Sequence, residues 1–469
     1  MIRARARGGL ATLAASLLLV TAFVAVPSGA AGADPARRPV IGCDRAATRV
    51  TVTVTSVLDP SCTYTAGFDI TASHVTLDCR GALIQGTGGI GILVVTPADV
   101  DMDDVTIRNC RVDGFLNSVH LRRQGFNTLA AGHEYDHHLS GVSVVDSTLT
   151  NSRGVGLYVD GYVTSTTIRH VTIRGSGSDG IYLDEGSRYG RIVENVIQEN
   201  GFRENGPLPE GTVTQFAGLT FRFWGPGREG IAVDGSRDNR IANNWIVDNS
   251  AGGVFLYTNC GEYVHSDPAN WVEHRFGADD NTIVGNVITG GRTGVWVGSR
   301  MAENVYPMDC SDVPYVSGPV QAITLDRAPR ATVRDNWIFG ADYGVRVEDD
   351  GARVVGNVVT APDASHHAVI VGTPFRTSVL HHPVTDTVVR DNVSNIAGNT
   401  SPYRWVDGVT GLDARGNTAL GRRSAFCQAP DVPRGPFVMV DAVAVQDPNG
   451  PPVPKPTFTI PRLGALPPC

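Results

Sequence analysis

Three aspartates end the same short strand-like pattern and could act together on a sugar. The segments GLYVD, GIYLD and GIAVD place Asp160, Asp184 and Asp234 at one position, with Glu185 beside the middle one. When carboxylates stack a few Å apart, their repulsion raises the pKa of at least one of them. An acid and a base of the same residue type are what glycoside hydrolysis requires. We therefore expect Asp184 and Asp234 to serve as acid and base or nucleophile, with Glu185 and Asp160 tuning their pKa.

The spacing of the carboxylates would decide the stereochemistry. Neighbouring coils suit a nucleophile and acid pair, whereas coils two apart suit an inverting pair with water between them. A competing interpretation is structural, because an aspartate before a glycine also caps turns.

Two segments downstream supply groups that could hold and enclose a sugar chain. Aromatic rings pack on sugar faces, and arginine can clamp carboxylate or hydroxyl groups. The candidates for substrate contact are Tyr257, Trp271, Arg275, Trp296 and Arg300. Glu262, also in such a segment, is a further candidate catalytic carboxylate, and with Arg300 it would close the site. Trp296 occupies one of the alternating positions of a predicted strand, so packing explains it as well as substrate binding does.

The elements that must position these groups are the short strands of a repeat. An asparagine recurs at one register of a strand pattern, as in RIVENVI, RIANNWI and TIVGNVI, with spacings of 49, 42, 50, 21, 35 and 25 residues. The seven positions are Asn195, Asn244, Asn286, Asn336, Asn357, Asn392 and Asn417. The shortest spacings define a unit of 21 to 25 residues, which is typical of a solenoid. Asparagine tolerates the left-handed backbone of a tight corner, and stacked amides can pair along the axis.

The rest of the pattern predicts an all-β chain without a useful amphipathic helix. Glycine-apolar strands alternate with the asparagine strands, and this alternation predicts parallel coils about 4.8 Å apart. We expect an N-terminal cap over residues 34–72, a solenoid over 73–423 and an extended proline-rich tail over 424–469. Insertions at 121–138, 202–228, 259–279 and 300–318 interrupt the repeat, and insertions in solenoids tend to emerge on the binding face.

From about residue 73 to residue 420 this repeated pattern of short strands and turns resembles that of the right-handed parallel β-helix superfamily, which includes pectate lyases, polygalacturonases and uronan epimerases. The resemblance implies a single-stranded right-handed parallel β-helix and a carbohydrate-active exported protein. It does not select a reaction, because fold alone is a weak guide to function. The paired acids and basic motifs of polygalacturonases are not matched as written.

The resemblance keeps two alternatives open beside the hydrolase. Residues 133–138 read HEYDHH and are similar to the Asp-Pro-His-Asp/Glu motif of alginate epimerases, although they lack the proline. Tyr135 or His137 would then be the base that takes a proton alpha to a uronate carboxylate, in a lyase or C5-epimerase. Many such lyases use a lysine, and the coil has none: the single lysine is Lys455. The other alternative is a non-catalytic glycan-binding or surface protein.

The N-terminus and the cysteines predict export. Residues 1–33 carry Arg3, Arg5 and Arg7, an apolar run and small residues before Asp34, which is typical of a secretory signal peptide. Eight cysteines in a secreted chain favour disulfides. The pairs suggested by neighbourhood are Cys43 with Cys62, Cys79 with Cys110, Cys260 with Cys310, and Cys427 with Cys469.

Charge and composition limit the classes of molecule that the protein is expected to bind. The net charge of −8, without a basic run beyond the leader, disfavours nucleic acid and anionic membranes. We expect a secreted monomer that acts on a polysaccharide, without a resident metal or cofactor. Calcium is an alternative, because acidic turns such as Glu348-Asp349-Asp350 can bind it.

Overall fold

The computed structural model describes most of the repeat. The described residues are 38–201, 213–216, 219–222, 228–258, 275–298, 328–361, 367–373, 376–377, 382–396, 402–421 and 424–428. The predicted signal peptide at 1–33 lies outside them, as does the tail beyond residue 428. So do the candidate site residues Glu262, Trp271 and Arg300 and the cysteines Cys260, Cys310 and Cys469. In the described part of the chain, no helix is both long and apolar enough to cross a membrane.

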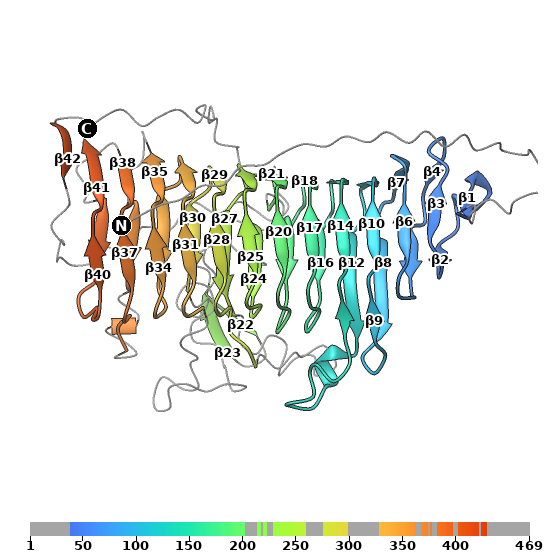
Figure 1. Ribbon diagram of the computed structural model, residues 1–469, viewed down its shortest axis with the longest axis horizontal. Helices are drawn as coiled ribbons and strands as arrows, with labels where there is room; N and C mark the ends of the chain where they lie inside the picture. Colours follow the sequence, from blue (N-terminus) through green and yellow to red (C-terminus); the bar gives the residue numbers. More distant parts are fainter. Residues whose placement is uncertain are drawn as a thin grey trace, which may run out of the picture. The chain divides into compact units, whose positions relative to one another are not determined.

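The chain winds through three long parallel sheets, one strand per sheet in each coil (Figure 1). The first sheet consists of β1 (Val40–Ile41), β3 (Ser56–Leu58), β6 (Thr76–Asp78), β10 (Thr106–Arg108), β14 (Ser143–Val145), β17 (Thr167–Arg169), β20 (Arg191–Val193), β25 (Arg240–Ala242), β28 (Thr282–Val284), β31 (Thr332–Arg334), β34 (Arg353–Val355), β37 (Val388–Arg390) and β40 (Asp413–Arg415). The second sheet consists of β4 (Thr63–Tyr64), β7 (Leu83–Gln85), β11 (Arg111–Asp113), β15 (Thr148–Thr150), β18 (Thr172–Arg174), β21 (Val196–Gln198), β26 (Trp245–Val247), β29 (Val287–Thr289), β32 (Trp337–Phe339), β35 (Val358–Ala361), β38 (Val393–Ile396), β41 (Thr418–Gly421) and β42 (Ser424–Gln428).

The third sheet carries the longest strands. It consists of β2 (Val50–Val52), β5 (Phe68–Ile70), β8 (Ile90–Pro97), β12 (Asn117–Gln124), β16 (Leu157–Val159), β19 (Ile181–Leu183), β24 (Glu229–Asp234), β27 (Gly252–Tyr257), β30 (Thr293–Val297), β33 (Tyr343–Val347), β36 (Val369–Val371) and β39 (Tyr403–Trp405). Outside these sheets, β9 (Met102–Asp103) pairs with β13 (Leu139–Ser140), β22 (Val213–Phe216) pairs with β23 (Leu219–Arg222), and two short 3-10 helices span Cys43–Arg45 (η1) and Phe126–Thr128 (η2). The predicted all-β solenoid is confirmed.

In the first sheet, the residue at the centre of each short strand points into the coil and contributes to the core, whereas in the third sheet the residues on either side of the centre do so, such as Leu157 and Val159. In the first sheet these residues stack as one column of buried aliphatic side chains: Leu77, Ile107, Val144, Ile168, Ile192, Ile241, Ile283, Val333, Val354 and Val389. Residues on either side point outward, which is the period-2 alternation of a strand with one buried face. In-register stacking of β-branched side chains therefore fixes the register of each coil.

The coil begins earlier than the sequence pattern predicts. Strands β1 to β5, within residues 40–70, already contribute to all three sheets, and Val52, Phe68 and Ile70 are buried in the core. The predicted boundary at residue 73 is therefore too late, because these first coils lack the asparagine and glycine spacing by which the later ones are recognised. At the other end, β42 pairs antiparallel with β41, so the chain reverses direction where the predicted tail begins.

The asparagine column forms the corner between the first and second sheets. Each amide donates to the Oδ1 atom of the next asparagine, from Asn195 Nδ2 to Asn244 Oδ1 at 2.9 Å through to Asn392 Nδ2 to Asn417 Oδ1 at 2.9 Å. The predicted ladder is thus present, but the predicted left-handed backbone is displaced by one residue. It belongs to the preceding residue, such as Glu194 at φ 58° and Asp335 at φ 56°. The reason is that the asparagine side chain must turn inward to reach its neighbours, so the residue before it makes the corner.

The insertions flank the third sheet. Those at 121–138, 259–279 and 300–318 follow β12, β27 and β30, on the connection from the third sheet to the first. The insertion at 202–228 lies between β21 and β24, on the connection entering the third sheet. The insertions are therefore joined to the repeat at the ends of the third-sheet strands.

Candidate functional site

The three predicted aspartates stand in one column at the end of the third sheet. Val159 is in register with Leu183, and Leu183 with Val233, so the residues that follow them, Asp160, Asp184 and Asp234, occupy equivalent positions on three successive coils. Neighbouring strands lie about 4.8 Å apart, which places successive carboxylates within direct electrostatic reach. All three side chains are buried, with 5%, 7% and 1% of the residue exposed.

Each carboxylate in the column is held by a side chain from the coil before it. The Tyr158 hydroxyl donates to Asp184 Oδ2 at 2.8 Å, and the Tyr182 hydroxyl donates to Asp234 Oδ2. His120 Nε2 lies 2.5 Å from Asp160 Oδ1. The donors are the residues in register on β12, β16 and β19. A carboxylate buried with hydrogen-bond donors keeps its charge more easily than one without.

The donors also form a continuous stack on the outer face of the third sheet. The His120 and Tyr158 rings stack at 4.7 Å between centroids, and the Tyr158 and Tyr182 rings meet edge to face at 5.2 Å. Burial, followed by the nearby carboxylates, raises the pKa of Tyr158 and of Tyr182 well above 10. At neutral pH both phenols are therefore proton donors and not bases.

Arg122 forms the accessible end of the column. Its side chain is 41% exposed, and its Nε atom lies 3.7 Å from Asp160 Oδ2. Arg122 Nη2 lies 3.3 Å from His120 Nδ1. A guanidinium can only donate, so this contact assigns the proton of a neutral His120 to Nε2, facing Asp160. A negatively charged group entering from solvent would meet Arg122 first.

Glu185, predicted to tune the pKa of the column aspartates, is held by the 259–279 insertion. Its side chain is fully buried, and Oε1 accepts the backbone N–H groups of Arg275 at 2.6 Å and Phe276 at 2.9 Å. A side chain added at Gly235, which has φ +60°, would come within 2.3 Å of the Glu185 carboxylate. Glu185 therefore anchors the end of the 259–279 insertion next to Asp184, and the glycine after Asp234 leaves room for it.

A partly buried ion pair between Arg275 and Glu134 joins two insertions close to Glu185. Arg275, predicted to bind substrate, donates from Nη1 to Glu134 Oε1 at 2.7 Å and from Nη2 to the Leu129 carbonyl at 2.8 Å. Burial opposes ionisation of Glu134, but hydrogen bonds from backbone and from Arg275 hold its pKa below the usual value. Arg275 thus ties insertion 259–279 to insertion 121–138.

Tyr135 and His137 do not form the predicted pair. The Tyr135 hydroxyl donates to the Gly186 carbonyl at 2.6 Å, its ring packs on Tyr162 and Phe276, and the guanidinium of Arg188 lies 3.5 Å above it. Burial raises the pKa of Tyr135 to about 12, which does not suit a base at neutral pH. His137 Nδ1 instead lies 3.3 Å from Asp101 on the surface.

The predicted aromatic contacts are packed inside the protein. Tyr257, in register with Asp234, is 1% exposed, and Trp296 is 4% exposed. The Trp296 Nε1–H donates to Glu348 Oε2 at 3.0 Å, and its ring packs on Tyr257 and Phe255. Tyr257 therefore continues the aspartate column, whereas Trp296 is in register with Phe255 and the donor row; both rings are buried packing, and neither presents an open face to a sugar.

The acidic turn suggested for calcium is filled by protein groups. Glu348 accepts from Arg346 at 2.6 Å, Asp349 accepts from Arg376 at 2.8 Å, and Asp350 accepts the backbone N–H of Thr385 at 2.7 Å. Among the described residues, the one cluster with metal-ligand spacing is Cys43, Asp59 and Cys62, and its two cysteines form a disulfide. The predicted disulfides Cys43–Cys62 and Cys79–Cys110 are both present.

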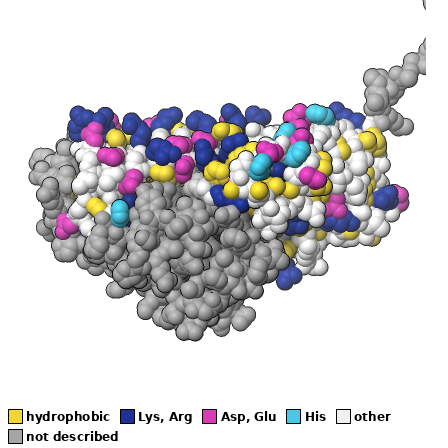
Figure 2. Space-filling view, turned by 90° about the horizontal axis from the view of Figure 1, so that it is seen from below, with side chains coloured by type: hydrophobic (Ala, Val, Ile, Leu, Met, Phe, Trp, Pro, Cys, Tyr) yellow, Lys and Arg dark blue, Asp and Glu magenta, His cyan; other side chains and the backbone are white. Residues whose placement is uncertain are grey.

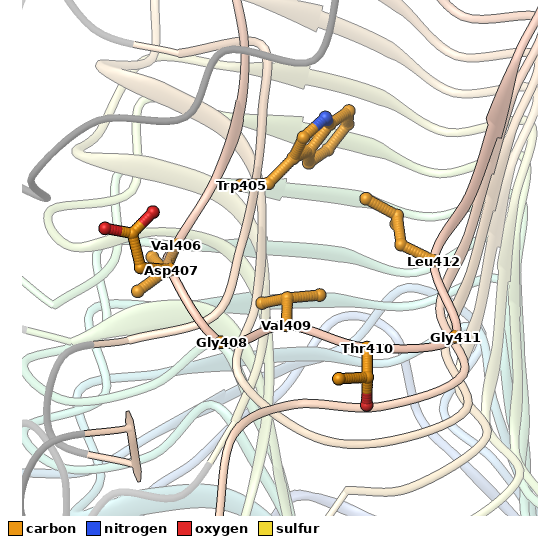
Figure 3. A pocket seen from close by; sticks show the side chains of 8 residues that line it. All are labelled: Trp405, Val406, Asp407, Gly408, Val409, Thr410, Gly411 and Leu412. Carbon is orange, nitrogen blue, oxygen red and sulfur yellow. The ribbon is translucent and has the colours of Figure 1, made fainter.

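A cavity of about 650 Å³ lies far from the column, at the C-terminal end of the coil. A single turn lines it, from Trp405 to Leu412, and these two side chains point toward one another (Figure 3). Asp407 is the one ionisable residue among those that line it, so it offers no paired chemistry.

The comparisons with known proteins agree with the three-sheet coil. A family model described as a right handed beta helix region matches residues 73–306. The chain belongs to the right-handed parallel β-helix superfamily. No curated protein sequence matches this β-helix.

Solved structures with the same fold include the A-module of mannuronan C-5 epimerase AlgE6 from Azotobacter vinelandii. The β-helix shares 14% identity with it at a TM-score of 0.50, over 84% of this chain and 90% of that one. An alginate lyase from Paenibacillus sp. is 14% identical, with a TM-score of 0.38 and 80% and 98% of the two chains covered. The catalytic domain of a GH87 alpha-1,3-glucanase is 12% identical, with a TM-score of 0.35 and 85% and 63% covered.

His120, Arg122, Tyr158 and Tyr182 were not among the site residues predicted from the sequence. Two of them could have been identified from the sequence as neighbours of the aspartates, because Tyr158 and Tyr182 each stand two residues before a column aspartate in GLYVD and GIYLD. Residues two apart on a strand share a face. His120 and Arg122 show the same spacing, but β12 lacks the glycine-apolar pattern, so only the strand register connects them to the column.

Proposed function

We propose that this protein is a polysaccharide-processing enzyme that cleaves a glycosidic bond with the carboxylates of the Asp160–Asp184–Asp234 column. The observation that carries the proposal is the column itself: three buried carboxylates in register on β16, β19 and β24, each with a donor from the previous coil. The polysaccharide-active members of the same fold support the substrate class, though not the reaction.

The reaction would use Asp184 with one of its two neighbours. Adjacent strands put two carboxyl groups about 5 Å apart, the separation of a nucleophile and an acid in a retaining glycosidase. Asp160 and Asp234 stand two strands apart, at about 9.6 Å, which is at the upper limit of the separation of an inverting pair. Burial of the column strengthens charge interactions with a developing oxocarbenium ion.

The test is product formation by the secreted protein on a panel of plant, algal and bacterial wall glycans, with products detected by mass. The Asp184→Asn and Asp234→Asn proteins should lose about 10²- to 10⁴-fold in rate while folding normally. Asp335→Asn is the matched control, because Asp335 is an exposed turn residue at φ 56°, where asparagine is tolerated. Full activity in both column variants, or an equal loss in Asp335→Asn, would reject the proposal.

Elimination or C5-epimerisation of a uronate is the second candidate, and a separate observation favours it. Arg122, at the open end, could pair with a uronate carboxylate, while His120 and Tyr158 lie beside it with protons to exchange. A lyase product absorbs in the near ultraviolet because a C=C bond forms beside the carboxylate. An epimerase would instead incorporate solvent deuterium. Either signal, in place of new reducing ends alone, would select this reaction over hydrolysis.

A further inference from the structure

A groove on the outside of the first sheet gathers arginines that have no acidic partner among the described residues. It has a volume of about 470 Å³ and crosses β14, β17, β20 and β25. Its lining consists of Val145, Asp146, Thr167, Arg169, Arg191, Val193, Glu194, Arg240, Ala242 and Asn243. The strands of a coil run across the coil axis, so a groove spanning four successive strands runs along that axis. Figure 2 shows basic side chains in a row along one long edge of the coil.

Arg169, Arg191 and Arg240 are exposed, and no carboxylate of the described residues lies within ion-pair distance of them. Two other arginines of the same sheet are paired with acids. Arg108 pairs with Asp78 at 2.9 Å, and Arg334 pairs with Asp335 at 2.6 Å.

The arrangement has a cost in the free protein. Arg191 and Arg240 are in register on neighbouring strands, where like charges directly opposite one another destabilise a sheet. The two acids of the groove do not relieve this repulsion, because both contact His170: Asp146 Oδ1 lies 3.2 Å from Nδ1 and Glu194 Oε2 lies 2.9 Å from Nε2. The three guanidiniums are left available to an anion from outside.

We propose that this arginine groove is a second binding site, which holds a linear polysaccharide bearing carboxylates. The class of ligand rests on the proposed function, since a polysaccharide is the expected substrate. A guanidinium presents a planar fork that matches a carboxylate in two hydrogen bonds, and repeated carboxylates along a polymer match guanidiniums repeated along the axis.

The groove is separate from the catalytic column. Its residues lie on the first sheet and in the turns that follow it, whereas the column ends the third sheet. A polymer held in the groove would raise the concentration of glycan near the column without taking part in the reaction.

The experiment compares binding of polygalacturonate and alginate with binding of neutral dextran by affinity electrophoresis. It uses the full chain carrying Asp184→Asn, so that turnover does not consume the ligand. The test variant adds Arg191→Thr and Arg240→Thr. Threonine already stands at this outward position of the sheet in Thr167, Thr282 and Thr332, so the fold should tolerate the change. The matched control is Arg353→Thr, which alters an exposed arginine at the same position three coils away from Arg240, outside the groove.

The expected result is salt-sensitive binding of an acidic glycan and none of dextran. The double variant should bind roughly tenfold more weakly and the control as strongly as its parent. The groove proposal is overturned by equal weakening in the control, by unchanged binding in the double variant, or by binding of a DNA oligonucleotide in preference to both glycans. Binding without any product from the wild-type protein would reject the proposed function and leave the groove standing. Product without groove-dependent binding would do the reverse.

Discussion

The hydroxyl of Tyr158 donates to Oδ2 of Asp184 at 2.8 Å, and this bond joins two successive coils. An equivalent contact occurs one coil further along the chain, where Tyr182 donates to Asp234, and one coil earlier, where His120 contacts Asp160. Each carboxylate of the column is therefore oriented by an aromatic residue of the preceding coil. The acids and their donors act as a unit, so a substitution of one donor should alter the pKa of the carboxylate to which it donates.

Tyr158→Phe removes the donor to Asp184 and keeps the ring that packs between His120 and Tyr182. A hydrogen bond to a charged group contributes about 1.5–3 kcal/mol, so we expect kcat to fall about 10- to 100-fold. The acidic limb of the pH–rate profile should move to higher pH, because the ionised carboxylate has lost a donor. Tyr64→Phe is the control: the Tyr64 hydroxyl donates to the Ile41 carbonyl at 2.5 Å, remote from the column. It should lower stability and leave the pH–rate profile unchanged. An unaltered profile in Tyr158→Phe would show that this bond is structural only.

Glu185→Gln and Glu185→Ala separate an anchor from a catalytic acid. Glutamine keeps an oxygen that can accept the N–H groups of Arg275 and Phe276, so an anchor should lose less than tenfold in kcat. Alanine leaves two buried N–H groups unsatisfied and should cost about 2–6 kcal/mol of stability, at about 1–3 kcal/mol for each group. Thermal unfolding and steady-state kinetics measure both. If glutamine already lowers kcat by 10² or more, Glu185 takes part in the chemistry, as the sequence analysis expected.

Tyr135 should make the protein sensitive to alkali. Its pKa is raised to about 12 in the folded protein against about 10 in the unfolded chain. A raised pKa in the folded state gives stability that is complete below pH 10 and is lost as the pH rises toward 12. Tyr135→Phe removes the titrating group, so the fall in stability over this range should be shallower than in the wild type. At pH 7 the variant should be about 1 kcal/mol less stable, because the bond to Gly186 is gone. Urea unfolding at pH 7 and pH 11 measures both effects, and an equal slope in the two proteins would contradict the assignment.

Asn286→Ala tests the ladder at its middle. The Asn286 amide donates to Asn336 Oδ1 at 2.9 Å and to the Ile241 carbonyl at 3.0 Å, and its Oδ1 accepts two bonds from Asn244. Losing a fully buried amide that makes four bonds should cost about 3–5 kcal/mol. Asn395→Ala, at an exposed position on β38, should change stability by less than about 0.5 kcal/mol. Similar unfolding midpoints for the two variants would mean that the ladder does not stabilise the coil.

Local pattern was sufficient for the architecture. The recurrence of Asn244, Asn286 and Asn336 and the alternation of apolar residues predicted a coil of parallel strands, because a repeated unit makes the same local contacts each time. The same regularity placed Asp160, Asp184 and Asp234 in one column. It also predicted the disulfide between Cys79 and Cys110, because the two cysteines stand at nearly equivalent points of neighbouring coils.

Roles that depend on contacts between insertions and coil could not be read from the chain. Glu185 looked like a member of the carboxylate column because it follows Asp184, yet neighbours on a strand or turn point in different directions, and its carboxylate holds the backbone of residues 275–276. Arg275 and Tyr135 looked like substrate and base groups, and only the packing of two insertions against each other showed them to be internal clamps.

The amino-acid sequence by itself determined the repeat, its column of aspartates and the asparagine corner, because each depends on residue type and spacing along one chain. The tertiary structure alone decided which donors hold which acids, which charges are neutralised inside and which arginines remain open on the first sheet. These follow from the register between coils, which brings together residues such as Tyr182 and Asp234 that lie 52 positions apart.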